Sequence, residues 1–417
     1  MNNSIVTTLE ETSYSIMTRR STDMEPSTSR SQGEARELAI LPSLWRHLPE
    51  ELLERLFAKL PFESLVRLRR VCKRWNHVIL SGEVSYLENP TAKCVPVHFG
   101  NGAFKIYNSI TKDWQEQSLA FLSLDILTNG MSLIATAGGL LCFHTYVPAN
   151  LVICNPLTRR FKQLEMPQPA AVEAPVPQLY TIDKIQVAMR ADTASGNYEV
   201  LVAATAQCDG NGGSLRGRVV GYDSASSSWK QFADVPRDIL FWLGGSVFCS
   251  GSFYCLAALI LVPGDGALWE WMLMKYDIDR DCWSVFPVIG AHVWQDHARI
   301  VEYQGSILLV TKASSNISIH RLDESRSSLW VHLKDLPLNV FTNLKEKTSE
   351  SLRNDIWWCI CRGELLFIID PCREQSGGGL IVLVHDLSKN TWDWIPMLEG
   401  NYDPHHLCPF EPSLASP

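Results

Sequence analysis

The stretch GLIVLVHDLSKNTWDWIP, residues 379–396, decides the fold of most of this chain. An apolar run ends at Asp386, five residues follow, and then come Trp392 and, four residues later, Pro396. An apolar run that stops at an Asp is typical of a strand entering a tight turn, because the Asp side chain hydrogen-bonds the backbone of the turn. The tryptophan is large enough to pack between neighbouring sheets. The stretch therefore predicts a β-hairpin whose returning strand buries an aromatic ring.

The same arrangement recurs through residues 96–412. Five copies share one spacing and a sixth has one extra residue; the six are Asn108/Trp114, Asn155/Phe161, Asp223/Trp229, Asp277/Trp283, Asp323/Trp330 and Asp386/Trp392. A proline follows the aromatic residue in five of the six copies, and successive copies begin 46 to 68 residues apart. Four-stranded units of roughly 50 residues, repeated in this way, predict an all-β propeller of about six blades, or seven. The alternative, a β-sandwich with tryptophans placed by chance, does not account for the recurrence.

Residues 44–80 differ in pattern and predict two helices. The first begins at Pro49, which suits a first helical turn, and ends before Pro61. Apolar positions recur at spacings of three and four residues: Leu48, Leu52, Leu53, Leu56, Phe57 and Leu60, then Leu65, Leu68, Cys72 and Trp75. A segment this short cannot cover so much apolar surface by itself. It therefore packs on the rest of the chain or presents that surface to a partner.

The segment LPEELLERLFAKLPFESLVRLRRVCKRW, residues 48–75, resembles an F-box. The matching elements are Leu48-Pro49, Glu50-Glu51, Leu60-Pro61, Ser64-Leu65 and Val71-Cys72-Lys73-Arg74-Trp75. The repeat region resembles the degenerate kelch repeats that follow the F-box in plant F-box/kelch-repeat proteins. The stretches that carry this second resemblance are Gly138-Gly139-Leu140-Leu141-Cys142 and Cys154-Asn155-Pro156-Leu157-Thr158.

These resemblances imply a small all-α F-box domain at 41–90 and an all-β kelch-type propeller at 96–412. Residues 1–40, rich in Ser and Thr, are expected to form a disordered tail. The implied function is that of a substrate receptor in an SCF-type E3 ubiquitin ligase. The F-box would dock on a Skp-type adaptor and, through it, on a cullin and a RING subunit. The propeller would hold a target protein for ubiquitination and proteasomal degradation. The implied adaptor-binding residues are Leu48, Pro49, Leu52, Leu56, Leu60, Pro61, Leu65, Val71, Cys72 and Trp75.

Two other classes of function stay open. One is a scaffold that keeps the adaptor contact without degradation. The other is an oxidase on a kelch propeller, which would need Tyr, His and Cys ligands converging in the central channel. The histidines at 144, 292, 297, 320, 332 and 385 show no recognisable ligand spacing, and no GxSxG, HExxH or GxxxxGK[ST] motif occurs. We therefore expect no catalytic residues, no cofactor and no metal site.

The composition argues against nucleic-acid and membrane partners. The 417 residues carry a net charge of −8, so there is no overall basic field to attract nucleic acid. The longest nearly unbroken apolar run, Phe253 to Pro263, has 11 residues and is too short to cross a bilayer. The first residues lack the pattern of a secretory signal. The twelve cysteines include no CxxC, and Cys359 and Cys361 would share one face of a strand. Reduced thiols and a nuclear or cytoplasmic location are expected.

Target recognition is expected in irregular inserts between strands, because propellers bind through the loops at one end. The inserts are residues 167–178, 207–217, 263–270 and 372–379. Five tryptophans fall outside the recurring position and either pack inside blades or line the binding face: Trp269, Trp271, Trp294, Trp357 and Trp358. The sequence identifies neither the target nor the residues that contact it.

Overall fold

The computed structural model divides the chain into two compact units, Met1–Asn89 and Pro90–Pro417. The described residues are 47–57, 68, 71–80, 95–100, 103–108, 113–128, 130–146, 148–156, 158–167, 185–192, 195–207, 215–260, 269–288, 298–313, 315–325, 329–347, 357–372, 379–399, 407–410 and 416–417. The expected tail at 1–40 lies outside them. None of the helices in this part of the chain is long and apolar enough to cross a membrane.

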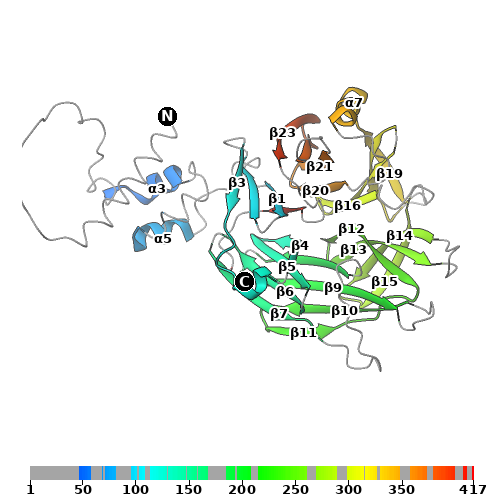
Figure 1. Ribbon diagram of the computed structural model, residues 1–417, viewed down its shortest axis with the longest axis horizontal. Coiled ribbons are helices and arrows are strands. Elements are labelled where there is room, and N and C mark those ends of the chain that lie inside the picture. Colours follow the sequence, from blue (N-terminus) through cyan, green and yellow to red (C-terminus); the bar gives the residue numbers. More distant parts are fainter. Residues whose placement is uncertain are drawn as a thin grey trace, which may run out of the picture. The chain divides into compact units, whose positions relative to one another are not determined.

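The first unit contains the helices α3 (Glu50–Phe57) and α5 (Lys73–Leu80) (Figure 1). The carbonyl of Pro49 accepts hydrogen bonds from the backbone N–H groups of Leu52 and Leu53, both at 3.2 Å, so the helix starts at the proline as predicted. Leu53 and Phe57 are fully buried. The rings of Phe57 and Trp75 meet edge to face, with centroids 5.4 Å apart. This contact joins α3 to α5.

The second unit consists of six four-stranded antiparallel sheets, which we term blades 1 to 6 (Figure 1). Blade 1 is β24 (Leu407–Phe410), β1 (Val95–Gly100), β2 (Ala103–Asn108) and β3 (Asp113–Gln117); blade 2 is β4 (Met131–Ala137), β5 (Leu140–Tyr146), β6 (Ala149–Asn155) and β7 (Arg160–Glu165). Blade 3 is β8 (Ile185–Ala191), β9 (Tyr198–Gln207), β10 (Leu215–Asp223) and β11 (Ser228–Gln231); blade 4 is β12 (Ile239–Cys249), β13 (Ser252–Ile260), β14 (Trp269–Asp277) and β15 (Cys282–Pro287). Blade 5 is β16 (Ala298–Tyr303), β17 (Ser306–Lys312), β18 (Ile317–Leu322) and β19 (Trp330–Asp335); blade 6 is β20 (Trp358–Arg362), β21 (Leu365–Cys372), β22 (Gly379–Asp386) and β23 (Thr391–Glu399).

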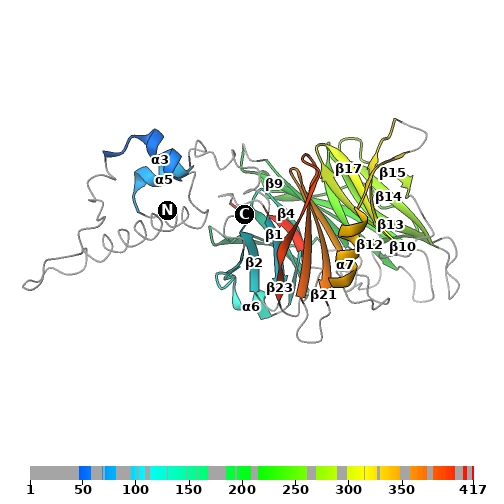
Figure 2. The same cartoon turned by 90° about the horizontal axis from the view of Figure 1, so that it is seen from above.

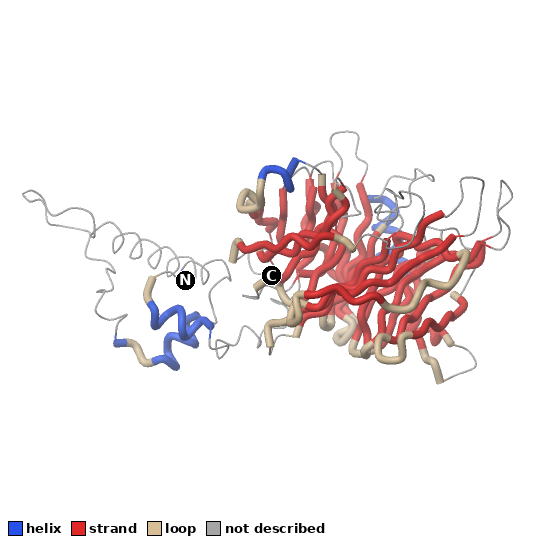
Figure 3. Tube along the Cα trace, turned by 90° about the horizontal axis from the view of Figure 1, so that it is seen from below, coloured by secondary structure: helices blue, strands red, loops and turns tan. Residues whose placement is uncertain are grey.

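The blades form a closed ring, which confirms the predicted propeller. Each innermost strand (β24, β4, β8, β12, β16 and β20) contacts the innermost strands of the two neighbouring blades. The C-terminal strand β24 completes blade 1 by pairing with β1, and this brings blade 6 beside blade 1 (Figure 2). In the described residues of this unit, the regular structure is strand apart from the short helices α6 (Leu124–Thr128) and α7 (Leu338–Lys347) (Figure 3).

The predicted hairpins join the third and fourth strands of every blade. Asp386 accepts hydrogen bonds at Oδ1 from the backbone N–H groups of Ser388 (3.1 Å) and Lys389 (2.9 Å), as an Asx-type turn requires. Trp330 donates from Nε1 to the carbonyl oxygen of Pro287, 2.8 Å away in the preceding blade. The Trp and Pro of the repeat therefore meet between blades, a contact that only the folded ring reveals.

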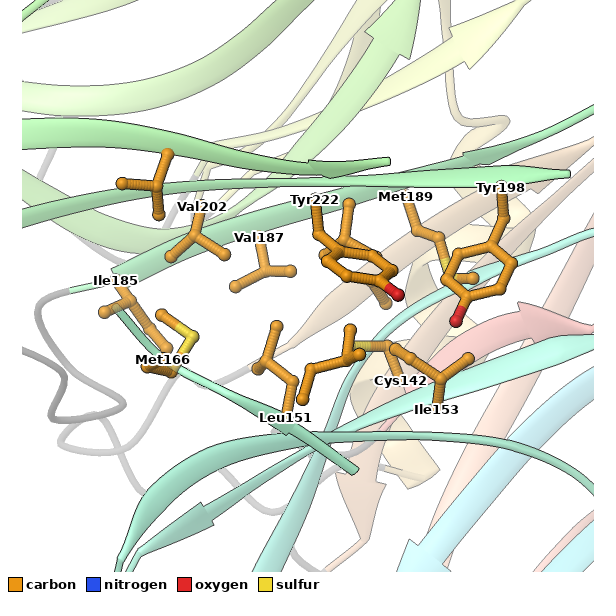
Figure 4. Packing of buried hydrophobic residues seen from close by; sticks show 14 of the residues in the cluster. Cys142, Leu151, Ile153, Met166, Ile185, Val187, Met189, Tyr198, Val202 and Tyr222 are labelled. Carbon is orange, nitrogen blue, oxygen red and sulfur yellow. The ribbon is translucent and has the colours of Figure 1, made fainter. Parts of the chain in front are cut away.

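Apolar side chains from adjacent blades hold the ring together. In Figure 4, Leu151 and Ile153 of blade 2 face Val187 and Val202 of blade 3, and all four are at most 4% exposed. Similar clusters lie between blades 3 and 4, 4 and 5, and 5 and 6. Each blade covers its apolar faces only against its neighbours, so closure stabilises all of them together.

The cluster between blades 5 and 6 contains further predicted side chains. Cys359 and Cys361 both belong to it, which confirms that they share a face of their strand. Trp357, which lies outside the recurring Trp position, is fully buried there, beside Phe341 and Leu344 of α7. Trp357 is therefore a blade-core residue.

Candidate functional site

The first candidate site is the apolar surface that α3 leaves uncovered. Leu53 and Phe57 point into the first unit, whereas Leu52, on the other side of the helix, is 44% exposed. Leu48 and Leu56 are half-buried, and Pro49 is exposed. The four-residue spacing therefore marks a stripe whose centre lies at positions 53 and 57. Its flank at Leu52 is exposed and can contact a partner.

The other predicted adaptor-binding residues have different surroundings. Trp75 is only 6% exposed and packs on Phe57, so its side chain contributes to the interior of the unit. Cys72 is exposed, and its Sγ accepts the backbone N–H of Trp75 at 3.4 Å, at the start of α5. Val71 is half-buried. Leu60, Pro61 and Leu65 lie outside the described residues.

Arg74 links the start of α3 to α5, a role that the sequence did not single out. Its Nε lies 3.6 Å from Oε1 of Glu50, and the guanidinium also donates a hydrogen bond to the carbonyl oxygen of Leu48. The Leu48-Pro49 step is thereby held against α5. A surface ion pair of this kind contributes little free energy, so its effect is to orient the step.

The second candidate site is one face of the propeller. Successive strands in a blade are antiparallel. Two kinds of connection therefore start at the same end of the blade: the one from the second to the third strand, and the one that leaves the fourth strand. The stretches 168–184, 208–214, 261–268 and 373–378 are all connections of these two kinds, as are those that contain α6 and α7. We term this side the insert face. The four predicted inserts therefore leave the ring on one side, although most of their residues lie outside the described ones.

The opposite side, the hairpin face, carries the first-to-second and third-to-fourth connections, which are short turns. Hydrogen bonds link neighbouring blades there: Glu364 accepts from the hydroxyl of Tyr303 (2.7 Å) and from Nε2 of Gln304 (2.8 Å). Glu324 likewise accepts from the hydroxyl of Tyr254 (3.1 Å) and pairs with Nζ of Lys275 (2.8 Å). These bonds join blade 5 to blade 6 and blade 4 to blade 5. Neighbouring blades are also joined at the insert face, where Nζ of Lys312 lies 2.6 Å from Oδ2 of Asp370, so the two faces differ in the length of their connections rather than in the links between blades.

Large apolar side chains are exposed on the insert face. Leu124 of α6 is 73% exposed, Leu338 at the start of α7 is 76% exposed, and Tyr146 at the end of β5 is 43% exposed. Each belongs to, or directly precedes, a connection on this side. Exposed apolar and aromatic side chains on a rigid scaffold are typical of protein-binding surfaces. The insert face is therefore the better candidate for holding a target.

The third feature is the central channel. A cavity of about 390 Å³ lies between the six innermost strands, each of which lines it. Its walls include buried thiols: burial raises the pKa of Cys408 to about 12, and it also raises the pKa of Cys359 well above its ordinary value. Both thiols are therefore neutral at pH 7. The part of the chain that the structure describes contains no group of three or more His, Cys, Asp or Glu side chains placed to hold a metal ion.

Comparison with known proteins gives matches for both units. A family model described as an F-box domain matches residues 45–84, and one described as the KIB1-4 beta-propeller matches residues 107–346. F-box only protein 6 of Arabidopsis thaliana is 24% identical over 309 residues, covering 70% of this chain and 59% of that protein. An F-box/kelch-repeat protein of Arabidopsis thaliana is 24% identical over 377 residues, covering 85% of this chain and 83% of that protein.

A solved structure, the Hadza microbial sialidase Hz136, is similar with a TM-score of 0.44 at 11% identity, and the match covers 66% of this chain and 59% of that one. A structural similarity with so low a TM-score and identity carries no information about function.

Proposed function

Because the chain belongs to the KIB1-4 beta-propeller family and carries an F-box domain ahead of its propeller, we propose that it is the substrate-recognition subunit of an SCF-type E3 ubiquitin ligase. Its relatives support a plant F-box/kelch-repeat protein. A receptor of this kind would itself be non-catalytic. The F-box would bind a Skp-type adaptor, which links it to a cullin and a RING subunit. The propeller would bind the target for ubiquitination and proteasomal degradation in the nucleus or cytoplasm.

The observation that supports the adaptor contact best is the split along α3. Leu53 and Phe57 are used inside the unit, and Leu52 remains 44% exposed. The buried residues of α3 fill the interior of the unit, and the helix still presents a leucine beside the fixed Leu48-Pro49 step. It therefore has an apolar flank to which another helix could bind. The predicted contact at Leu48, Pro49 and Leu52 stays a proposal, which the exposure of Pro49 and Leu52 supports.

The mechanism needs no nucleophile in this chain. A receptor that holds a target on its propeller raises the local concentration of target lysines near a ubiquitin-carrying enzyme. The insert face would hold the target, since it carries the exposed Leu124, Tyr146 and Leu338. The hydrogen bonds and ion pairs between neighbouring blades would keep the blades in register while the target is bound.

The test is binding of the full chain to a Skp-type adaptor, with Leu48→Ala combined with Leu52→Ala. Leu52 is 44% exposed and Leu48 is partly exposed, so each truncation should cost about 1 kcal/mol of binding free energy. The double variant should therefore bind the adaptor about 30-fold more weakly. The control is the double variant Leu124→Ala and Leu338→Ala, whose leucines are exposed on the propeller; it should keep the wild-type affinity.

Adaptor binding at wild-type strength by the Leu48 and Leu52 variant would show that the α3 flank is not the contact. Degradation is tested separately. A target captured by the propeller should accumulate when the proteasome is inhibited, and a target whose level stays constant would argue for a scaffold.

A further inference from the structure

A second cavity, of about 360 Å³, lies between blades 3 and 4 at the hairpin face. Its wall is apolar: Leu201 and Phe232 line it on the blade 3 side, and Phe248 and Ile278 line it on the blade 4 side. These side chains belong to, or pack against, the apolar cluster between the two blades. The cavity therefore continues this cluster toward solvent, and a ligand in it could bury apolar surface.

The cavity lies where the repeat lacks one of its links between blades. At the next interface, Nζ of Lys275 in blade 4 lies 2.8 Å from Oε1 of Glu324 in blade 5. Counted from the aspartates of the repeat, the corresponding residues one interface earlier are Gly221 in blade 3 and Ile278 in blade 4, which cannot form an ion pair. The ring of Phe232 takes the place of a side chain at position 221, since a Cβ there would lie 2.6 Å from it. An apolar wall thus replaces the ionic link.

Charged side chains of both signs surround the apolar wall, and three of them already have partners. Nη2 of Arg190 lies 2.7 Å from Oε2 of Glu199, which neutralises both groups. The carboxylate of Asp223 accepts a hydrogen bond at Oδ1 from the backbone N–H of Ala225, 2.9 Å away, within its own turn. These three side chains therefore have little to offer a ligand.

The two remaining charged side chains of the lining are Lys230 and Asp279, and both are exposed. Lys230 is paired with Gly221 across β10 and β11, and its Nζ lies 4.7 Å from the centroid of the Phe232 ring. Asp279 belongs to the turn that follows β14 in blade 4. Within the part of the chain that the structure describes, neither side chain has an ion-pair partner. The cavity therefore has an available cation on its blade 3 side and an available anion on its blade 4 side.

We propose that this cavity binds a free amino acid with an apolar side chain, in its zwitterionic form. Lys230 pairs with the ligand carboxylate and Asp279 with its ammonium group, while the apolar side chain packs on Phe232, Phe248 and Ile278. The volume of about 360 Å³ lies within the range of roughly 300–1,000 Å³ found for small-molecule pockets. A ligand with a single charge would pair with one of the two groups and leave the other without a partner.

The experiment uses the full chain and matched probes, with binding followed by calorimetry and ligand-observed NMR. The probes are L-phenylalanine, N-acetyl-L-phenylalanine, which lacks the ammonium group, and L-phenylalaninamide, which lacks the carboxylate. Phenylalanine should bind saturably at millimolar concentration. Each blocked probe should bind about fivefold more weakly, because it loses one ion pair at an exposed rim. L-Serine should also bind more weakly, because its side chain buries little apolar surface on the cavity wall.

Two variants assign the ends of the ligand. Lys230→Gln removes the partner of the carboxylate, so it should weaken phenylalanine binding about fivefold and leave phenylalaninamide binding unchanged. Asp279→Asn removes the partner of the ammonium group, so it should weaken phenylalanine binding to a similar extent and leave N-acetylphenylalanine binding unchanged. Combining each variant with the probe that lacks the matching group isolates one ion pair at a time.

The control variant is Lys345→Gln with Glu346→Gln, which removes one charge of each sign from exposed positions of α7 and should bind phenylalanine as the wild type does. Equal affinity for the three phenylalanine probes, unchanged phenylalanine affinity in both cavity variants, or no saturable binding at millimolar phenylalanine would each overturn the proposal. So would an equal loss of affinity in the control variant, because the effect would then be one of overall charge. Adaptor binding plays no part in these readouts.

Discussion

At the scale of the residue, one buried histidine has an environment that lowers its pKa. His385 in β22 is 1% exposed, and its ring stacks on Trp392 with centroids 3.8 Å apart and planes 5° from parallel. Burial is the main cause that lowers its pKa to about 4, and the charge of Lys334, whose Nζ lies 3.2 Å from Nε2, lowers it further. The imidazole is therefore neutral in the folded protein at pH 7.

This histidine should make the propeller less stable in acid. Its ordinary pKa is 6.5 and its folded pKa about 4, so between these values the unfolded chain binds the proton and the folded chain does not. The free energy of unfolding should therefore fall as the pH drops from about 6.5 to about 4. Denaturant unfolding across this range should show a pH slope steeper by up to one proton in wild type than in His385→Gln.

The control for this measurement is Leu333→Ala, which shortens an exposed side chain of the same unit that carries no titratable group. It should keep the wild-type slope. Parallel pH curves for the wild type and His385→Gln would show that the His385 ring does not carry the effect.

At the scale of the element, the hairpins were predictable because their signals are local. The Asp or Asn and the aromatic residue belong to the same hairpin, so their separation in the sequence determines how they lie in the structure. The partner of the aromatic is not local: Trp114 donates from Nε1 to the carbonyl oxygen of Pro396, 2.9 Å away in the last blade. Prediction from local sequence has the same limit for the helix α3. Its apolar spacing predicted a stripe, but only the position of α5 decides that Leu53 faces inward and Leu52 outward.

Replacing one repeat tryptophan tests how much the link between blades contributes. Trp330→Phe removes the hydrogen bond to Pro287 and part of a ring that is 6% exposed, so it should cost about 1–3 kcal/mol. The apparent Tm should fall by a few degrees. Trp229→Phe is the matched control, since Trp229 is half-buried and contacts the Tyr222 ring. Equal Tm values for the wild type and Trp330→Phe would show that the link adds nothing.

At the scale of the whole molecule, ring closure rests on a short strand. β24 pairs with β1 over four residues, from Val95 opposite Phe410 to His98 opposite Leu407. It also contacts β4 and β20 on either side. Because each blade depends on its neighbours, loss of this strand should weaken every interface in the ring.

Truncation tests that dependence. A chain ending at residue 406 lacks β24, so it should expose the inner edge of β1 together with apolar sheet surface and elute as aggregates in size-exclusion chromatography. A chain ending at residue 411 keeps the strand and should elute as the wild type does. A monodisperse 406-residue chain with the wild-type melting temperature would mean that the ring closes without β24.

The repeat predicted the ring and a number of about six blades, or seven, because a recurring unit must stack on copies of itself; the structure has six. The inserts were predicted from interruptions of the strand pattern, and the topology shows that all four start on one face of the ring. The lining of the central channel was not predictable, because residues that contribute to it, such as Ser132, Gln186 and Trp358, lie far apart in the sequence and follow no motif. In the sequence, Trp358 is distinguished only as a tryptophan outside the recurring position. Convergence at an axis is a property of the closed ring alone.

The late position of β24 has a consequence for synthesis of the chain. Blade 1 begins with β1, which ends at Gly100, but its innermost strand begins only at Leu407. Ribosomes add about 5–20 residues per second, so the inner edge of β1 waits roughly 15–60 seconds for its partner. Throughout that time the nascent propeller is an open ring with an unpaired edge, and other chains can pair with it. Productive folding in the cell therefore depends on shielding the first blade until the last few residues have been translated.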